Sequence, residues 1–156
     1  MALNVGDKAP AFSVLDQDGK QVQLADYAGK WVLLYFYPKD DTPGCTKEAC
    51  ALRDNLPRFG DMKAVVLGVS VDSVKSHKKF VDKYKLPFTL LADEEKQIVK
   101  AYGVWGEKKF MGRTFQGTKR MSFLIKPDGT IAKIYDTVKP ALHAQEVLSD
   151  LSTLSA

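Results

Sequence analysis

Apolar residues occur in two different patterns along the chain. In some segments they form short continuous runs, which are typical of buried strands, and in others they recur every three to four positions, which is typical of amphipathic helices. The longest run, residues 31–37, is apolar or aromatic throughout. It is therefore predicted to be a central strand covered on both faces. Pro38 follows directly and ends the strand, because proline has no N–H to donate to a neighbour.

Segments with the strand pattern alternate with segments with the helix pattern, and two Asp-Gly turns indicate β-hairpins. An alternation of this kind predicts an α/β fold, with an N-terminal β-hairpin and a central mixed β-sheet flanked by helices on both faces. Besides residues 31–37, strands are predicted over 12–15, 21–24, 64–71, 86–91, 121–125 and 130–135, and helices from 42 or 43 to about 55 and over 73–85, 93–102 and 141–154.

Length and composition narrow the class of protein. A chain of 156 residues suits a single domain, 1–156, with one core. No apolar run approaches the roughly 20 residues of a membrane helix, and the first residues lack the basic start and apolar stretch of a secretory signal. We therefore expect a cytoplasmic protein with no membrane association, unless a targeting segment has been removed.

The net charge of +4 is mild and spread along the chain. Nucleic-acid binders usually concentrate basic charge on one face. The nearest approach to such a concentration is the stretch 108–120, which is predicted to be a solvated loop, and no nucleic-acid partner is expected. The overlapping stretch 103–112 is compatible with an apolar lip beside a site or with a simple packed loop.

Two cysteines, Cys45 and Cys50, carry the candidate chemistry. Cys45 falls in the first turn of a predicted helix that follows the buried strand, and strand ends are where α/β folds usually bind ligands. A helix N-terminus offers unpaired N–H groups and about half a positive charge. Both favour thiolate over thiol. The thiolate is the nucleophilic form, and a reachable thiolate of this kind forms a sulfenic acid.

Cys50 lies five residues further along the same predicted helix. In an intact helix the two Cα atoms would be about 8–9 Å apart on different faces, whereas a disulfide needs them within about 7 Å. If the two sulfurs pair, the helix must unwind locally. The alternative for each thiol is inert packing, since buried cysteine behaves as a small hydrophobe.

The segment around Cys45 resembles the active site of a known family. Its pattern Pro38-x-x-x-Thr42-x-x-Cys45 is similar to the peroxiredoxin signature, and the fuller string through Glu48-Ala49-Cys50 resembles the bacterioferritin comigratory protein, or peroxiredoxin Q, subfamily. The likeness covers nearly the whole chain, with further matching segments that begin at Gly6, Tyr102, Arg120 and Pro127.

The resemblance implies a thioredoxin-like fold and the reduction of hydrogen peroxide and organic hydroperoxides. It implies that Cys45 is the peroxidatic cysteine and Cys50 the resolving cysteine, and that thioredoxin or a similar dithiol protein reduces the oxidised enzyme. No metal or organic cofactor is implied, and members of this branch are often monomers.

The remaining site residues have roles that make physical sense within this resemblance. The Thr42 hydroxyl can orient the peroxide, since it both donates and accepts. Arg120 can stabilise the thiolate and the charge that develops on the leaving oxygen, together with backbone N–H groups at 44 and 45. Pro43 can shield the thiolate, Pro38 shapes the loop, and Glu48 can brace Arg120 by an ion pair. The alternatives are a helix cap for Thr42, an edge charge on a strand for Arg120 and a solvated helix residue for Glu48.

Other readings of the sequence remain open. A cysteine–histidine pair would need His77 or His143 beside Cys45, but both are expected at the surface or at the edge of the core. A zinc site would need about four close ligands, which two cysteines do not supply. The competing functions are a dithiol oxidoreductase or redox sensor on the same fold and a non-catalytic binding role.

Overall fold

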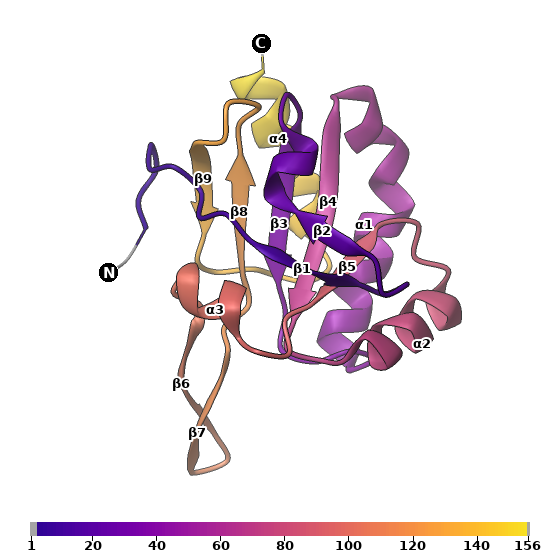
Figure 1. The fold of residues 1–156 in the computed structure, drawn as a ribbon, viewed down its shortest axis with the longest axis vertical. Coiled ribbons are helices and arrows are strands. Elements are labelled where there is room, and N and C mark those ends of the chain that lie inside the picture. The colour runs from indigo at the N-terminus through magenta and orange to yellow at the C-terminus, as the bar shows by residue number, and fades with distance from the viewer. Residues whose placement is uncertain (1–2, 156) are drawn as a thin grey trace.

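The computed structural model describes residues 3–155 and is built around a seven-stranded mixed sheet with the order β2-β1-β5-β4-β3-β8-β9 (Figure 1). The central strands β3, β4 and β5 run parallel, and the others are antiparallel to their neighbours. The strands of this sheet are β1 (Ser13–Asp16), β2 (Gln21–Gln23), β3 (Trp31–Phe36), β4 (Ala64–Ser70), β5 (Thr89–Ala92), β8 (Met121–Ile125) and β9 (Ile131–Tyr135).

Helices cover both faces of the sheet, as the alternating pattern predicts (Figure 1). The helices are α1 (Pro43–Asp61), α2 (Val74–Tyr84), α3 (Gln97–Ala101) and α4 (His143–Leu154), with a short 3-10 helix at Leu24–Tyr27. One core cluster lies between the sheet and α1, α2 and α4. The other lies beneath α3 and the N-terminal segment. Strand β3 lies between these clusters, which explains its unbroken apolar run.

Helix α1 is longer than the sequence predicts. It continues past residue 55 to Asp61, with Pro57 inside it. A proline in a helix interior costs about 3 kcal/mol because it removes a hydrogen bond and crowds the preceding turn. Phe59 is completely buried in the core, so packing beyond the proline keeps the last turn helical.

Helix α3 is shorter than the predicted 93–102. Lys96 has a left-handed backbone with φ of 61°, which interrupts a regular helix, so the helix begins only at Gln97. The carboxylate of Asp93 accepts a hydrogen bond from the backbone N–H of Val99 and holds the turn before the helix. The other predicted elements are present, with ends that differ by up to three residues.

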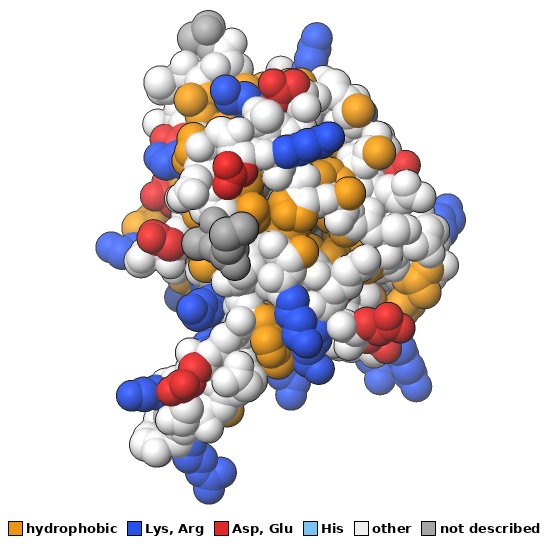
Figure 2. Space-filling view, turned by 60° about the vertical axis from the view of Figure 1, so that its left-hand side comes forward, with side chains coloured by type: hydrophobic (Ala, Val, Ile, Leu, Met, Phe, Trp, Pro, Cys, Tyr) orange, Lys and Arg blue, Asp and Glu red, His pale blue; other side chains and the backbone are white. Residues whose placement is uncertain are grey.

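Most of the basic stretch 108–120 lies in a β-hairpin and not in a loop, although it is largely exposed, as expected. Within the described part of the chain, strands β6 (Trp105–Phe110) and β7 (Arg113–Thr118) pair only with each other, and the hairpin stands away from the body of the molecule (Figures 1 and 2). Met111 and Gly112 form its tip, both with positive φ. Figure 2 shows Lys and Arg side chains along it. Among residues 3–155, no helix combines the length and apolar character that crossing a membrane requires.

Candidate active site

Cys45 lies at the start of helix α1, which follows the central strand β3 after a short loop. Thr42 is the N-cap of α1 with an extended backbone, and Pro43 occupies the first helical position, where its missing N–H leaves no bond unmade. Cys45 is therefore in the first turn, as predicted, and its residue is only 1% exposed. The free N–H groups of this turn and the positive end of the helix dipole both favour a negatively charged sulfur.

The guanidinium of Arg120 binds both functional side chains of the first two turns. Its Nη2 donates to Cys45 Sγ at 3.1 Å, and its Nη1 donates to Glu48 Oε1 at 2.6 Å. Arg120 lies between β7 and β8, just outside the sheet, so it is not the edge charge on a strand that the sequence left open. Arg120, a permanently charged fork 75 positions after Cys45 in the chain, thus connects the side chains of Cys45 and Glu48.

Glu48 is completely buried, so it is not a solvated helix residue. Its Oε1 forms the ion pair with Arg120, while its Oε2 has no hydrogen-bond partner among the described residues. Burial raises the pKa of Glu48 to about 7, although the Arg120 guanidinium opposes that rise. The carboxyl therefore gains and loses its proton near neutral pH.

The raised pKa of Glu48 predicts a specific pH dependence of stability. Between its unfolded value of 4.5 and its folded value of about 7, the folded chain holds a proton that the unfolded chain has lost. The stability from this group is thus fully present below pH 4.5 and declines as pH rises through 7. Relative to Glu48→Gln, the wild-type free energy of unfolding should fall by up to about 3 kcal/mol over this range. Urea titrations of both proteins at several pH values measure this, and parallel curves would contradict it.

The hydroxyl of Tyr35 on β3 is a second buried oxygen with no hydrogen-bond partner within residues 3–155. It belongs to the surroundings of the site and was missed by sequence reasoning. Burial, followed by the charges of Glu48 and Cys45, raises the pKa of Tyr35 well above its usual value, so its phenol stays protonated. Only its place in an apolar strand two residues before Tyr37 was visible in the sequence, and this gave no signal of a functional role.

The other predicted residues surround the cysteine in different ways. The Thr42 hydroxyl does not cap the helix; it donates to the carbonyl oxygen of Lys39 at 2.9 Å. Its donor is thus engaged while its lone pairs remain available to accept. Pro38 is half-buried directly after β3, and Pro43 is exposed at the start of α1.

Gly44 lets the guanidinium come close to the helix. A Cβ atom built on Gly44 would lie 3.1 Å from Nη2 of Arg120. Gly44→Ala should therefore push the guanidinium by a few tenths of an ångström and slow peroxide attack by about threefold to tenfold, since small misplacements at a reacting centre are costly. Stopped-flow oxidation by hydrogen peroxide measures the effect. Gly60→Ala, which would meet nothing within 4 Å, is the control, and equal rates in all three proteins would contradict the prediction.

Cys50 is half-buried on the same helix, and both thiols are free. Because α1 is continuous from Pro43 to Asp61, its geometry keeps the two sulfurs on different faces. The structure thus has the folded, dithiol arrangement that the sequence predicts for the reduced state.

The hairpin residue Lys108 interacts electrostatically with Arg120 and Cys45. Its Nζ donates to the carbonyl oxygen of Thr118 at 3.0 Å, and the side chain is partly buried. Burial lowers the pKa of Lys108, Arg120 lowers it further, and Cys45 acts in the opposite direction. A predicted solvated charge is therefore part of the electrostatic surroundings of the sulfur.

The two histidines are not where the sequence placed them. His77 and His143 are both buried, with 0% and 1% exposure, and not at the surface or the core edge. His77 bonds to Asp40 and the Leu91 carbonyl, and His143 bonds to Ser122 and Glu146. No hydrogen bond among the described residues joins either ring to Cys45.

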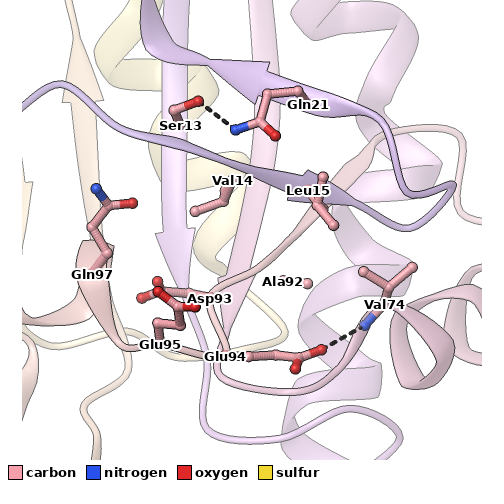
Figure 3. Close-up of a pocket in the computed structure, with 10 residues that line it drawn as sticks. All are labelled: Ser13, Val14, Leu15, Gln21, Val74, Ala92, Asp93, Glu94, Glu95 and Gln97. Carbon is pink, nitrogen blue, oxygen red and sulfur yellow. Dashed lines mark hydrogen bonds between the residues drawn. The ribbon is translucent and has the colours of Figure 1, made fainter.

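A separate cavity of about 270 Å³ is lined by residues of β1, β2 and β5 and of the turn before α3 (Figure 3). Three acidic residues, Asp93, Glu94 and Glu95, lie along it. Glu94 accepts from the backbone N–H of Val74 at 3.3 Å. None of the sequence-predicted site residues lines this cavity, so it is not the site built around Cys45.

Comparison with known proteins gives a consistent result. The model of the AhpC/TSA family matches residues 5–134. A putative peroxiredoxin bcp of Haemophilus influenzae is 49% identical over 97% of this chain and 98% of its own length. Peroxiredoxin Bcp of Bacillus subtilis is 44% identical over 99% of each chain.

Solved structures agree with the sequence relatives. A cysteine-to-serine mutant of Xylella fastidiosa PrxQ superposes with a TM-score of 0.94 at 36% identity, over 100% of this chain and 99% of that one. The bacterioferritin comigratory protein of Xanthomonas campestris, described for its alkyl peroxide reduction activity, gives a TM-score of 0.88 at 38% identity, over 93% and 92%. The predicted thioredoxin-like fold class is confirmed by these neighbours. The chain belongs to the AhpC/TSA family and, within it, to the peroxiredoxins of the Bcp and peroxiredoxin Q type, which are thiol-dependent peroxidases.

Proposed function

We propose that the Cys45 thiolate attacks the terminal oxygen of a peroxide, with Arg120 as the principal electrostatic partner. The observation that carries this proposal is the 3.1 Å contact between Nη2 of Arg120 and the sulfur. An S–O bond forms as the O–O bond breaks. Cys45 becomes a sulfenic acid, and the leaving oxygen takes up a proton to depart as water or alcohol. The guanidinium and the N–H groups of the first helical turn stabilise the charge that develops on that oxygen.

Thr42 supports this reaction as a hydrogen-bond acceptor. Its hydroxyl proton is engaged by the carbonyl of Lys39. The Thr42 oxygen therefore offers a substrate only its lone pairs, which accept hydrogen bonds. A protonated peroxide has a hydrogen to give, and acceptance of that hydrogen by Thr42 would orient the O–O bond toward the sulfur. In this proposal, Pro38 and Pro43 hold the loop and the helix start without adding competing N–H donors, and Glu48 fixes the orientation of Arg120.

Cys50 completes the cycle as the resolving cysteine. Its thiolate attacks the sulfenic sulfur as the S–O bond breaks, the leaving hydroxide takes up a proton to depart as water, and an intramolecular disulfide results. Since the intact helix keeps the two Cα atoms too far apart, the first turns of α1 must unwind for this step. A dithiol protein such as thioredoxin then reduces the disulfide by thiol–disulfide exchange and restores both thiols.

The substrates in this proposal are hydrogen peroxide and organic hydroperoxides. The alkyl peroxide activity named for the Xanthomonas campestris relative supports the second class. The cycle needs no metal or organic cofactor because the sulfur itself carries the two electrons. We infer a monomer in the cytoplasm, where the reducing environment keeps thiols available.

The direct test mixes the reduced protein with one equivalent of hydrogen peroxide in a stopped-flow instrument. Cys45 should be oxidised orders of magnitude faster than a free thiolate, and a thioredoxin system should then sustain turnover. Oxidation no faster than that of a free thiolate at the same pH would favour a dithiol oxidoreductase or redox sensor on this fold.

A further inference from the structure

The loop between β3 and α1 is fastened to helix α2 by a buried polar cluster that the proposed chemistry does not use. Its centre is the carboxylate of Asp40, which accepts from the hydroxyl of Tyr37 at 2.5 Å, from Ser76 Oγ at 2.8 Å and from His77 Nδ1 at 2.7 Å. The backbone N–H of Asp40 donates to Asp72 Oδ2 at 2.8 Å. The start of α1 and helix α2 lie at the same edge of the sheet (Figure 1).

Both ring nitrogens of His77 are engaged in the core. Its Nε2 lies 2.8 Å from the carbonyl oxygen of Leu91, which can only accept, so Nε2 carries a hydrogen. Its Nδ1 faces Asp40, whose carboxylate also receives hydrogens from Tyr37 and Ser76. His77 Nδ1 and Asp40 Oδ2 thus form a buried 2.7 Å contact between the loop and α2, with side chains 0% and 4% exposed.

This cluster is a finished hydrogen-bond network. Ligand atoms of Asp40, Asp72 and His77 lie within 4.8 Å of one another. Asp40 Oδ2, Asp72 Oδ2 and His77 Nδ1 each already have a hydrogen-bond partner among the described residues. A cation would have to displace hydrogens that already satisfy these atoms. The cluster is therefore suited to holding the backbone and not to binding a metal ion.

Asp40 is two residues before Thr42 and five before Cys45, so the cluster fixes the backbone from which the site is built. None of its hydrogen bonds within residues 3–155 reaches the part of α1 that begins at Cys45. We propose that the His77–Asp40 pair is a positioning device for peroxide attack: it holds the loop 38–42 against α2 while leaving α1 free to unwind for disulfide formation. This inference rests on the proposed function and adds two residues to it.

The neighbouring aspartate provides a natural comparison. Asp41 also contacts α2, through Lys83 at 2.8 Å and the hydroxyl of Tyr84 at 2.7 Å, but both of these bonds are at the surface. Exposed ion pairs contribute little to stability, whereas removing one member of a buried hydrogen-bond network leaves its partners unsatisfied in the core. The buried contact should therefore matter to catalysis and the exposed one should not.

The test separates the two chemical steps by rapid quench, thiol trapping and mass spectrometry, which distinguish the sulfenic acid from the disulfide. His77→Leu should slow the oxidation of Cys45 by hydrogen peroxide at least about tenfold, because the loop loses its anchor, while the later disulfide step changes less than about twofold. His77→Asn keeps a donor near the Nδ1 position and should recover the first step to within about threefold of wild type. Lys83→Met should leave both steps within about twofold of wild type.

Equal slowing of both steps, or an unchanged first step in His77→Leu, would overturn the proposal. If that variant does not fold by circular dichroism, Asp40→Asn is measured in its place. It preserves the size of the side chain and should show the same selective loss of the first step. Failure of the proposed function itself would be seen differently, as the absence of a fast peroxide step in the wild-type protein.

Discussion

Replacing Arg120 with methionine is expected to slow the oxidation of Cys45 by hydrogen peroxide by about 10²–10³-fold, the usual effect of removing one donor that stabilises a developing negative charge. The methionine keeps much of the length of the side chain but removes the bonds to Cys45 Sγ and Glu48 Oε1. It also leaves the Glu48 carboxyl buried without a cation. Stopped-flow oxidation under single-turnover conditions measures the effect directly.

Two further variants separate charge from geometry in this experiment. Arg113→Met removes the same charge from an exposed position on the hairpin strand β7 and should leave the rate within about twofold of wild type. Arg120→Lys keeps the charge but cannot bind two partners with a planar fork, so an intermediate rate is expected. A rate for Arg120→Met within twofold of wild type would remove Arg120 from the mechanism.

Replacing Cys50 with serine should abolish turnover while sparing the first chemical step. The variant should consume one equivalent of peroxide at a rate within about twofold of wild type, because Cys50 has no part in the attack and serine is similar in size. It should then stall as a sulfenic acid that further peroxide overoxidises. A steady-state assay with a thioredoxin system, combined with mass spectrometry of the stalled protein, measures both outcomes.

The companion variant Cys45→Ser should consume no peroxide at all, which shows that the single equivalent belongs to Cys45. Amide hydrogen exchange adds an independent readout: exchange over residues 46–53 should accelerate when the wild-type protein is oxidised to the disulfide, and not in Cys50→Ser. Sustained thioredoxin-driven turnover of Cys50→Ser would exclude Cys50 from the cycle.

Most of the fold follows from local patterns. The unbroken apolar run of residues 31–37 requires cover on both faces, and β3 has it, since α1 packs on one side and the α3 side of the core on the other. The position of Cys45 in the first turn of a helix followed from Thr42 and Pro43 as helix-start residues. No local pattern indicates the contact between Cys45 and Arg120, which is 75 positions away. It could be expected from the sequence only through the family resemblance.

The features that sequence reasoning missed depend on tertiary contacts. His77 reads as one residue of an amphipathic helix, and nothing near it in the chain reveals that Asp40 meets its ring in the core. The hairpin of β6 and β7 turns at Met111-Gly112, which lacks the Asn-Gly or Asp-Gly signal of most tight hairpins, and its strands show little apolar alternation. The continuation of α1 past Pro57 depends on the burial of Phe59.

Pro57 has one more consequence for a helix whose front is proposed to melt and reform in every cycle. Without an N–H, it forms no bond back to the carbonyl of Arg53, so the hydrogen-bond ladder of α1 already has a gap there. Unwinding that starts at the cysteine end therefore meets an interruption in the cooperative hydrogen bonding at Pro57. The final turn is held by the burial of Phe59 in the core, so it can stay folded while the first turns unwind and can template their refolding.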